Sequence, residues 1–139
     1  MKKLCGFSFL LLLLHLPSAR AEEPIYLQCN IHGVWTGFFD HSSSGGNFSE
    51  VASISVHDGF LDMHSTNFMF YNRVQVQNNS FTVNESFSIP QGVGGGQVFI
   101  EVNRVTGQFN GSYNVVFSNG YAEIKSAEGN CTKYSGRKF

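Results

Sequence analysis

The sequence predicts an all-β protein: a single antiparallel barrel or tight sandwich of about eight strands, closed by one disulfide. Two observations predict this fold class. Apolar and polar residues alternate along most of the chain, which is the period of a strand, and no stretch has the period of a helix. The alternating runs follow one another through short turns, which indicates antiparallel order because parallel strands need long crossovers. One open sheet of this size would expose an apolar face, so we expect it to close or fold over.

The first 21 residues are predicted to form a secretory signal peptide, and residues 22–139 a single β domain. The opening MKKL supplies a basic start, an apolar run continues to Leu16, and the Ala-Arg-Ala triplet ending at Ala21 fits a signal-peptidase site. The apolar run is too short for a spanning helix, and no later segment approaches the roughly 20 apolar residues that a span needs. We therefore expect an exported protein, periplasmic or secreted, without a membrane span.

The charge of the exported chain disfavours several partners. Removal of 21 of the 139 residues takes away three of the nine basic residues and none of the ten acidic ones, so the formal net charge becomes −4. Nucleic-acid binding requires a basic stripe on the protein, and anionic lipid surfaces also attract basic residues. We therefore expect no nucleic-acid partner and no docking on anionic lipid.

Two cysteines, Cys29 and Cys131, remain after cleavage, and an exported chain meets an oxidising compartment. We expect them to form a disulfide between positions that lie 102 residues apart. Two alternatives remain open, a pair of free thiols and a zinc site, although the Cys-x-x-Cys spacing typical of structural zinc is absent.

Eight alternating runs are predicted to be strands: residues 33–39, 51–56, 60–64, 69–77, 81–89, 97–105, 108–117 and 121–126. The pairs Asp58-Gly59 and Asn119-Gly120 are typical two-residue hairpin turns, in which both central positions require a positive φ. Two segments are predicted to be flexible loops from their glycine and serine content: HSSSGGN at residues 41–47 and GVGGG at residues 92–96.

The stretch HDGFLDMH, from His57 to His64, is the one place where metal-ligating residue types gather. A turn at its Asp-Gly pair sets Val56 opposite Leu61 on a core face, and leaves His57, Asp62 and His64 together on the other face. Two imidazoles and a carboxylate would suit zinc or another first-row metal. The alternative is a solvated hairpin face, and it is the interpretation that we adopt, so no metal and no other cofactor is expected.

No catalytic group stands out in the sequence. The serines lie in predicted loops or alternate along strands, a Gly-x-Ser-x-Gly motif is absent, and the acidic residues are scattered. The glycine-rich segment 92–96 lacks the following helix, the Lys and the Ser or Thr of a phosphate loop. We therefore expect a non-enzymatic binding module, with a protein or a component of the cell envelope as its partner.

Motifs in the last third of the chain resemble a group of small exported proteobacterial proteins. VNRVTG, from Val102 to Gly107, resembles their Asn-Arg-x-Thr-Gly hairpin, and the Gly-x-Cys that ends at Cys131, with the final Lys-Phe, resembles their basic end. These proteins are uncharacterised, so the resemblance implies architecture and no activity. Arg104 in the first motif is the best candidate for an anion contact, and a surface ion pair with a carboxylate is the alternative.

The stretch HGVWTGF, from His32 to Phe38, contains a Gly-x-Trp triplet similar to the opening of the first strand in calycin-like barrels, among them lipocalins, avidins and small bacterial metalloprotease inhibitors. The resemblance implies that Trp35 packs at one end of a barrel and is a candidate binding residue. The chain is short for a lipocalin, and Trp35 is its only tryptophan, whereas avidins use several. The alternative functions are therefore binding of a small apolar ligand inside the barrel, and inhibition of an exported hydrolase.

Overall fold

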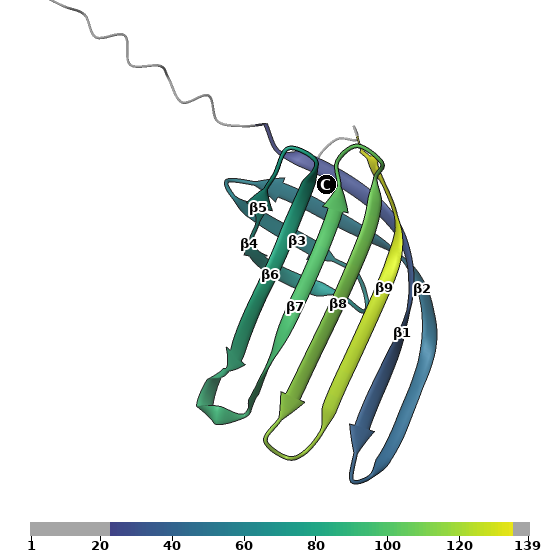
Figure 1. Cartoon of the computed structure of the whole chain (residues 1–139), viewed down its shortest axis with the longest axis vertical. Helices are drawn as coiled ribbons and strands as arrows, with labels where there is room; N and C mark the ends of the chain where they lie inside the picture. Colours follow the sequence, from purple (N-terminus) through teal and green to yellow (C-terminus); the bar gives the residue numbers. More distant parts are fainter. Residues whose placement is uncertain (1–22, 135–139) are drawn as a thin grey trace, which may run out of the picture.

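This computed structural model describes residues 23–134, and the predicted signal peptide and the Lys-Phe end lie outside the described residues. The elements follow one another as β1 (Ile25–Phe39), β2 (Ser42–His57), β3 (Phe60–His64), β4 (Met69–Arg73), β5 (Gln75–Val76), β6 (Ser80–Ile89), the 3-10 turn η1 (Pro90–Gly92), β7 (Gly94–Asn103), β8 (Gln108–Phe117) and β9 (Ala122–Lys133). The nine strands form one antiparallel sheet in the order β4-β3-β2-β1-β9-β8-β7-β6-β5 (Figure 1).

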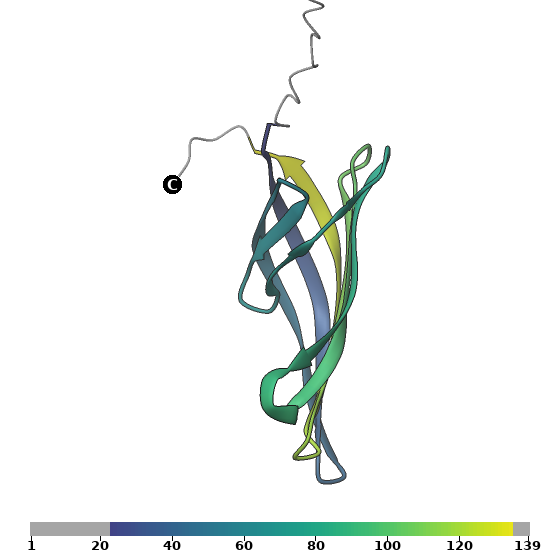
Figure 2. The ribbon, with the colours of Figure 1, turned by 90° about the vertical axis from the view of Figure 1, so that its left-hand side faces the viewer.

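The sheet curls into a nearly closed barrel, which confirms the predicted fold class. The two strands that end the sheet order, β4 and β5, follow one another in the chain and are separated only by Val74. The N–H of Val74 donates a hydrogen bond of 2.9 Å to the carbonyl of Gly59 in the β2–β3 turn. In the side view the β3–β4 hairpin lies against the concave side of the long strands and covers only one end of them (Figure 2).

The part of the barrel that this hairpin covers, called the closed half below, holds the hydrophobic core. It comprises β3, β4 and β5 with residues 25–33 of β1, 48–57 of β2, 80–84 of β6, 98–103 of β7, 108–112 of β8 and 126–133 of β9. Strand alternation directs every second side chain inward. Phe109, Leu61 and Ile100 are 0 % exposed. Burial of each such side chain stabilises the fold by roughly 1.5–3 kcal/mol.

Two-residue turns fix the register of the first three strands. Asp58 and Gly59 have φ angles of 52° and 78°, and β2 pairs with β3 in the predicted register. The same geometry joins β1 to β2 at Asp40 and His41, with φ of 46° and 62°. Neither of these two residues is glycine, so only a weak turn signal is present there.

The predicted disulfide between Cys29 and Cys131 is confirmed. The two residues lie directly opposite each other on β1 and β9 and are 0 % and 8 % exposed. A bridge between positions 102 residues apart stabilises the fold by about 4.7 kcal/mol in the chain-entropy model. The bridge excludes free thiols and a zinc site at these cysteines, and it is compatible with an oxidising, exported location.

The two segments that were predicted to be loops are largely strand. Most of HSSSGGN belongs to β2, and the last three residues of GVGGG begin β7. Their glycines make room for aromatic rings: a Cβ on Gly46 would lie 3.2 Å from Nε1 of Trp35, and a Cβ on Gly96 would lie 2.9 Å from Cζ of Phe87. The prediction was wrong because composition suggested flexibility, whereas these glycines permit close approach within a strand.

Strand ends also differ from the prediction. β1 begins at Ile25 rather than at residue 33, and β9 continues to Lys133, because the additional residues of these strands pair with each other in the closed half. The run predicted as one strand over residues 69–77 is divided at Val74 into two strands at opposite ends of the sheet order.

The remainder of the sheet, called the open half below, extends past the hairpin. It consists of residues 34–39 of β1, 42–47 of β2, 85–89 of β6, 94–97 of β7, 113–117 of β8 and 122–125 of β9, together with Tyr121, which precedes β9. Among the described residues, the strands β3, β4 and β5 pair with no part of it. The inner side of the open half is therefore the place where the barrel wall stands without a covering element (Figure 2).

Candidate functional site

Aromatic residues gather on the inner face of the open half. They are Trp35, Phe87, Tyr113, Phe117 and Tyr121, and all five are partly exposed. Phe87 stacks on Tyr113 with ring centroids 5.8 Å apart, and Phe117 lies against Tyr121 at 5.7 Å. Tyrosine and tryptophan offer a large contact area and lose little conformational entropy on binding.

Glycines beneath the rings let them lie on the sheet. A Cβ on Gly37 would lie 3.0 Å from Oη of Tyr121 and 3.6 Å from Cζ3 of Trp35. A Cβ on Gly96 would likewise lie against the ring of Phe87, at 2.9 Å from its Cζ. The rings therefore cover the backbone of neighbouring strands themselves, in the place where the closed half uses a hairpin.

An ion pair lies among these rings. Nζ of Lys125 is 3.0 Å from Oε1 of Glu123, and the two side chains are 18 % and 21 % exposed. The hydroxyl of Tyr121 donates a hydrogen bond of 2.9 Å to Oε2 of Glu123. Nζ of Lys125 also donates to the carbonyl of Asn67, at 3.3 Å, and lies 6.0 Å from the ring centroid of Tyr113. A few polar groups on a mostly apolar face are what orient a bound ligand.

The ion pair shifts the pKa values of its neighbours. Burial raises the pKa of the Glu123 carboxyl, but hydrogen bonds from Lys125 and Tyr121 and the charge of Lys125 together outweigh burial, so that the pKa is lowered. The hydrogen bond to Glu123 is the main cause of the raised pKa of Tyr121, and burial is the main cause of the raised pKa of Tyr113. Near pH 7 the site thus holds a carboxylate and two neutral phenols.

The loop between β3 and β4 forms the boundary between the two halves. Glu50 accepts hydrogen bonds from the backbone N–H groups of Thr66 and Asn67, at 2.9 and 3.2 Å, and Lys125 holds the carbonyl of Asn67. Phe68 of the same loop is 2 % exposed and belongs to the core. The inward-pointing charges of Glu50 and Lys125 therefore fasten the loop that separates the core from the open half.

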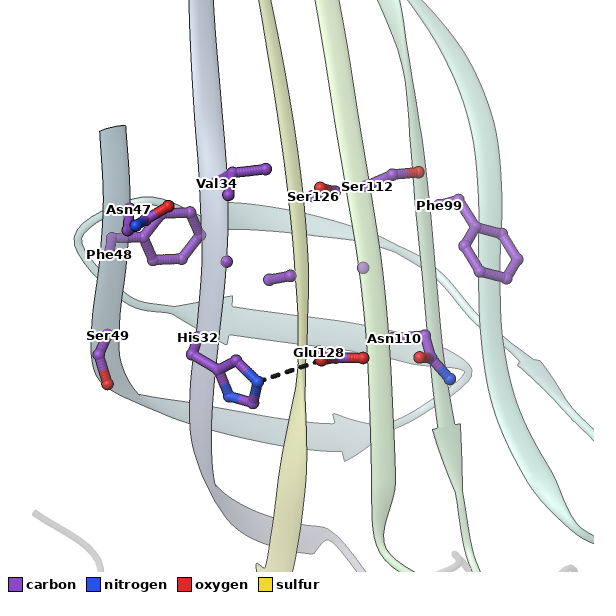
Figure 3. A pocket seen from close by; sticks show the side chains of 13 residues that line it. His32, Val34, Asn47, Phe48, Ser49, Phe99, Asn110, Ser112, Ser126 and Glu128 are labelled. Atoms are coloured by element: carbon purple, nitrogen blue, oxygen red, sulfur yellow. Dashed lines mark hydrogen bonds and ion pairs between the residues drawn. The ribbon is translucent and has the colours of Figure 1, made fainter. Parts of the chain in front are cut away.

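A second candidate site is a shallow hollow of 830 Å³ on the outer face of the sheet (Figure 3). Small side chains such as Ser112 and Ser126 line it, and Phe99 stands at one side. Nε2 of His32 lies 3.2 Å from Oε1 of Glu128, but these side chains are 63 % and 70 % exposed. Such an exposed pair contributes about 0–1 kcal/mol, so the hollow offers polar contacts without a buried anchor.

The structure places the predicted metal candidates in two separate pairs. Oδ1 of Asp62 lies 3.0 Å from Nε2 of His64, whereas Nδ1 of His57 lies 3.6 Å from Oδ2 of Asp58. Within residues 23–134 no group of three His, Cys, Asp or Glu side chains is arranged to hold a metal ion. The hairpin face thus carries two separate His–Asp contacts at the positions that the sequence singled out.

The predicted anion candidate, Arg104, lies at the disulfide end of the barrel. Its Nη1 donates a hydrogen bond of 3.1 Å to the carbonyl of Gln77, and its guanidinium carbon lies 4.9 Å from the ring centroid of Phe81. No ion pair joins it to a carboxylate of the described chain. It lines a hollow of 360 Å³ together with Lys133, so it remains a candidate for an anion contact.

Trp35 lies in a row of paired inner residues that crosses the sheet from β2 to β6, where the open half meets the closed half. In sheet order the row contains Gly46, Trp35, Lys125, Tyr113, Val98 and Glu85. The indole lies over Gly46 of the neighbouring strand. The sequence therefore identified one member of the candidate site and missed the ion pair beside it.

The missed residues include Phe87, Tyr113 and Phe117 as well as Tyr121, Glu123 and Lys125. For the last three, the alternation of side chains along the strand was a usable signal. All three differ from Cys131 by an even number of positions, and Cys131 must point inward to reach Cys29. The predicted last strand ended at residue 126, so this relation to the disulfide was not drawn.

Comparisons with known proteins identify no relative. No family model, no curated protein and no solved structure matches the chain. The described residues include no helix with the length and apolar character that crossing a membrane requires. The geometry of the two faces is therefore the basis for assigning a function.

Proposed function

We propose that the protein is an exported, non-enzymatic binding module that holds a partner protein on the inner face of the open half. The observation that carries this proposal is the set of partly exposed aromatic rings around the Lys125–Glu123 ion pair. Tyrosine and tryptophan are prominent among the residues that carry most of the energy at protein interfaces. The polar groups of Tyr121, Glu123 and Lys125 supply the orientation that an apolar face lacks.

Two features favour a protein over a small apolar ligand. The inner residues of the closed half, such as Phe109 and Leu61, are packed to 0 % exposure, which leaves an apolar ligand no space among them. The open half has free sides at β2 and β6, whereas small-molecule sites enclose most of their ligand. A curved wall with two free sides fits an inserted segment of a protein. Inhibition of an exported hydrolase is one form that this binding would take.

Capture of a partner from periplasmic extract tests the proposal. The immobilised mature chain is compared with Tyr113→Ser and with Val116→Ser, a matched control on the outer face of the same strand whose side chain is 59 % exposed. We expect one saturable partner to bind the wild type and the Val116→Ser variant and to be lost by Tyr113→Ser, with circular dichroism confirming that both variants fold. Absence of any saturable partner would contradict the proposal, and so would equal binding by Tyr113→Ser.

A further inference from the structure

The strand β6 has a free edge along the open half. One side of β6 pairs with β7 without interruption from Ser80 to Ile89. The other side pairs with β5 only at Phe81 and Thr82. Within the described chain, residues 83–89 therefore have no strand on this side, directly beside the proposed partner site.

Strand geometry identifies the backbone groups that point out of this edge. The carbonyl of Asn79 accepts a hydrogen bond from the N–H of Arg104 in the β7–β8 turn, at 2.8 Å, whereas the carbonyl of Ser80 accepts one from the N–H of Gln77, which precedes β6, at 2.9 Å. The carbonyl of Asn79 thus points toward the β7 side and that of Ser80 toward the β5 side. The backbone groups of successive residues alternate between the two sides along an antiparallel strand. Along the free edge, the residues that direct both N–H and C=O away from β7 are therefore Asn84, Ser86 and Ser88.

The side chains along this edge select what can pair with it. Val83, Phe87 and Ile89 are apolar and share the inner face with Glu85, which is exposed. Among the described residues, no hydrogen bond or ion pair engages the Glu85 carboxylate. An inward-pointing charge on an edge strand opposes indiscriminate pairing, because an incoming apolar strand would bury it. A basic residue on the incoming strand removes this obstacle.

We infer that the partner protein adds an extended segment to the free edge of β6, with apolar residues alternating inward and a Lys or Arg placed opposite Glu85. The inference rests on the proposed function and names the chemistry of the partner. The added strand closes the open half in the way that β3, β4 and β5 close the other half. Its backbone pairs with Asn84, Ser86 and Ser88, and its inward side chains extend the face formed by Phe87 and Tyr113.

Two other arrangements are less favourable. The free edge of β2 in the open half consists of SSSGGN, residues 42–47, which offers an incoming strand no large side chain to pack on. Pairing of β6 with the β6 of a second copy would bring two Glu85 carboxylates onto one face near the symmetry axis, which like charges oppose. Charge complementarity at Glu85 therefore favours a foreign, basic strand on β6.

Peptide binding tests the edge directly. The peptide TVTVTKTV has its lysine opposite Glu85 when it pairs antiparallel to β6, and it ends opposite Val83, before the part of the edge that β5 occupies. TVTVTETV is its acidic match. Fluorescence anisotropy of labelled peptides should show that the full mature chain prefers the basic peptide by about fivefold, the upper range of a cross-strand charge pair. The Glu85→Lys variant should reverse this preference. Equal binding of both peptides by the wild type would overturn the inference.

Proline variants distinguish binding at the free edge of β6 from binding at the free edge of β2. Ser86→Pro removes an N–H that points out of β6 and leaves the β6–β7 ladder intact, so peptide binding should fall about tenfold or more. Ser43→Pro is the matched control, because by the same alternation its N–H points out of the free edge of β2. Loss of binding in Ser43→Pro alone would overturn the inference. Light scattering that shows a dimer dissolved by Ser86→Pro would do the same, because the occupant would then be a second copy.

Capture of the partner from extract distinguishes failure of the edge inference from failure of the proposed function. If Tyr113→Ser loses the partner while Ser86→Pro and Glu85→Lys keep it, the proposed function stands and the edge inference is wrong. If all three variants keep the partner, the proposed function itself is wrong. Loss of the partner in all three, with Ser43→Pro unaffected, supports both.

Discussion

The closed and open halves of the barrel are built from the same six long strands, yet their inner faces differ in composition. The closed half presents aliphatic side chains such as Ile31 and Ile100 to a covering hairpin. The open half presents aromatic rings that lie over glycines, with the Lys125–Glu123 pair between them. An inner face can therefore be covered by another element or by its own aromatic rings. Only a face that is covered by its own rings remains accessible to a partner.

Removal of the disulfide should have the largest effect on stability. The double variant Cys29→Ala/Cys131→Ala loses a bridge between positions 102 residues apart, which corresponds to about 4.7 kcal/mol of the free energy of unfolding in the chain-entropy model. Urea denaturation, followed by the fluorescence of Trp35, measures the change. A loss below about 1 kcal/mol would show that the central ladder of the sheet holds without the bridge.

Truncation of one aromatic residue in each half should show that the two halves contribute differently to the free energy of unfolding. Phe109→Ala removes a side chain that is 0 % exposed in the closed half, and the loss should be about 3–5 kcal/mol. Phe117→Ala lies on the same strand and the same face but is partly exposed, so the loss should be about 1 kcal/mol. Equal losses in denaturant titrations would contradict the difference between the halves.

Substitution of glycines tests the cover formed by the rings. A Cβ on Gly96 would lie 2.0 Å from the carbonyl oxygen of Asn114 and 2.9 Å from the ring of Phe87, so Gly96→Ala should cost about 1–3 kcal/mol. Gly46→Ala meets only the indole of Trp35, at 3.2 Å, and should cost less. Thermal melting of both variants measures which loss of stability is larger. A smaller loss in Gly96→Ala than in Gly46→Ala would contradict this prediction.

The dependence of stability on pH should come in part from the open half. The pKa of Glu123 is lowered in the folded protein, so its contribution is present above about pH 4.5 and is lost as the pH falls through the folded-state pKa. The pKa of Tyr121 is raised, so its contribution is present below pH 10 and is lost as the pH rises through the folded-state pKa. Glu123→Gln should cost about 0.5–1 kcal/mol at neutral pH and flatten the acid limb of the profile. Lys125→Met is the companion variant, because it removes the cation that lowers the pKa of Glu123. If stability falls at acid pH in Glu123→Gln as it does in the wild type, other carboxyls cause that fall.

Local patterns were sufficient to predict most of the closed half. The Asp58-Gly59 turn determined the register of β2 with β3, and the disulfide between Cys29 and Cys131 determined the contact between β1 and β9. Both features act over short distances or through a covalent bond. Alternation then decides which side chains enter the core.

The open half could not be predicted in the same way, because its glycines have a role that only the neighbouring strand reveals. Gly46 and Gly96 lie within segments whose composition is typical of loops, and the rings that need them come from other parts of the chain. Lys125 and Glu123 point inward because the strand that contains them continues to the disulfide. Such pairings between distant segments are set by tertiary packing and leave no local pattern.

The place of β1 beside β9 also determines when the sheet can be completed. In the sheet order, β1 to β4 are joined by consecutive hairpins, β5 to β9 follow one another in the same manner, and the β1–β9 ladder joins the two groups. Contacts between the first and last strands require the longest loop closure, which slows folding. During synthesis from the N-terminus, one side of β1 stays unpaired until the last strand has emerged. That side of β1 presents unpaired backbone N–H and C=O groups during this time, when wrong pairing with another chain competes with folding.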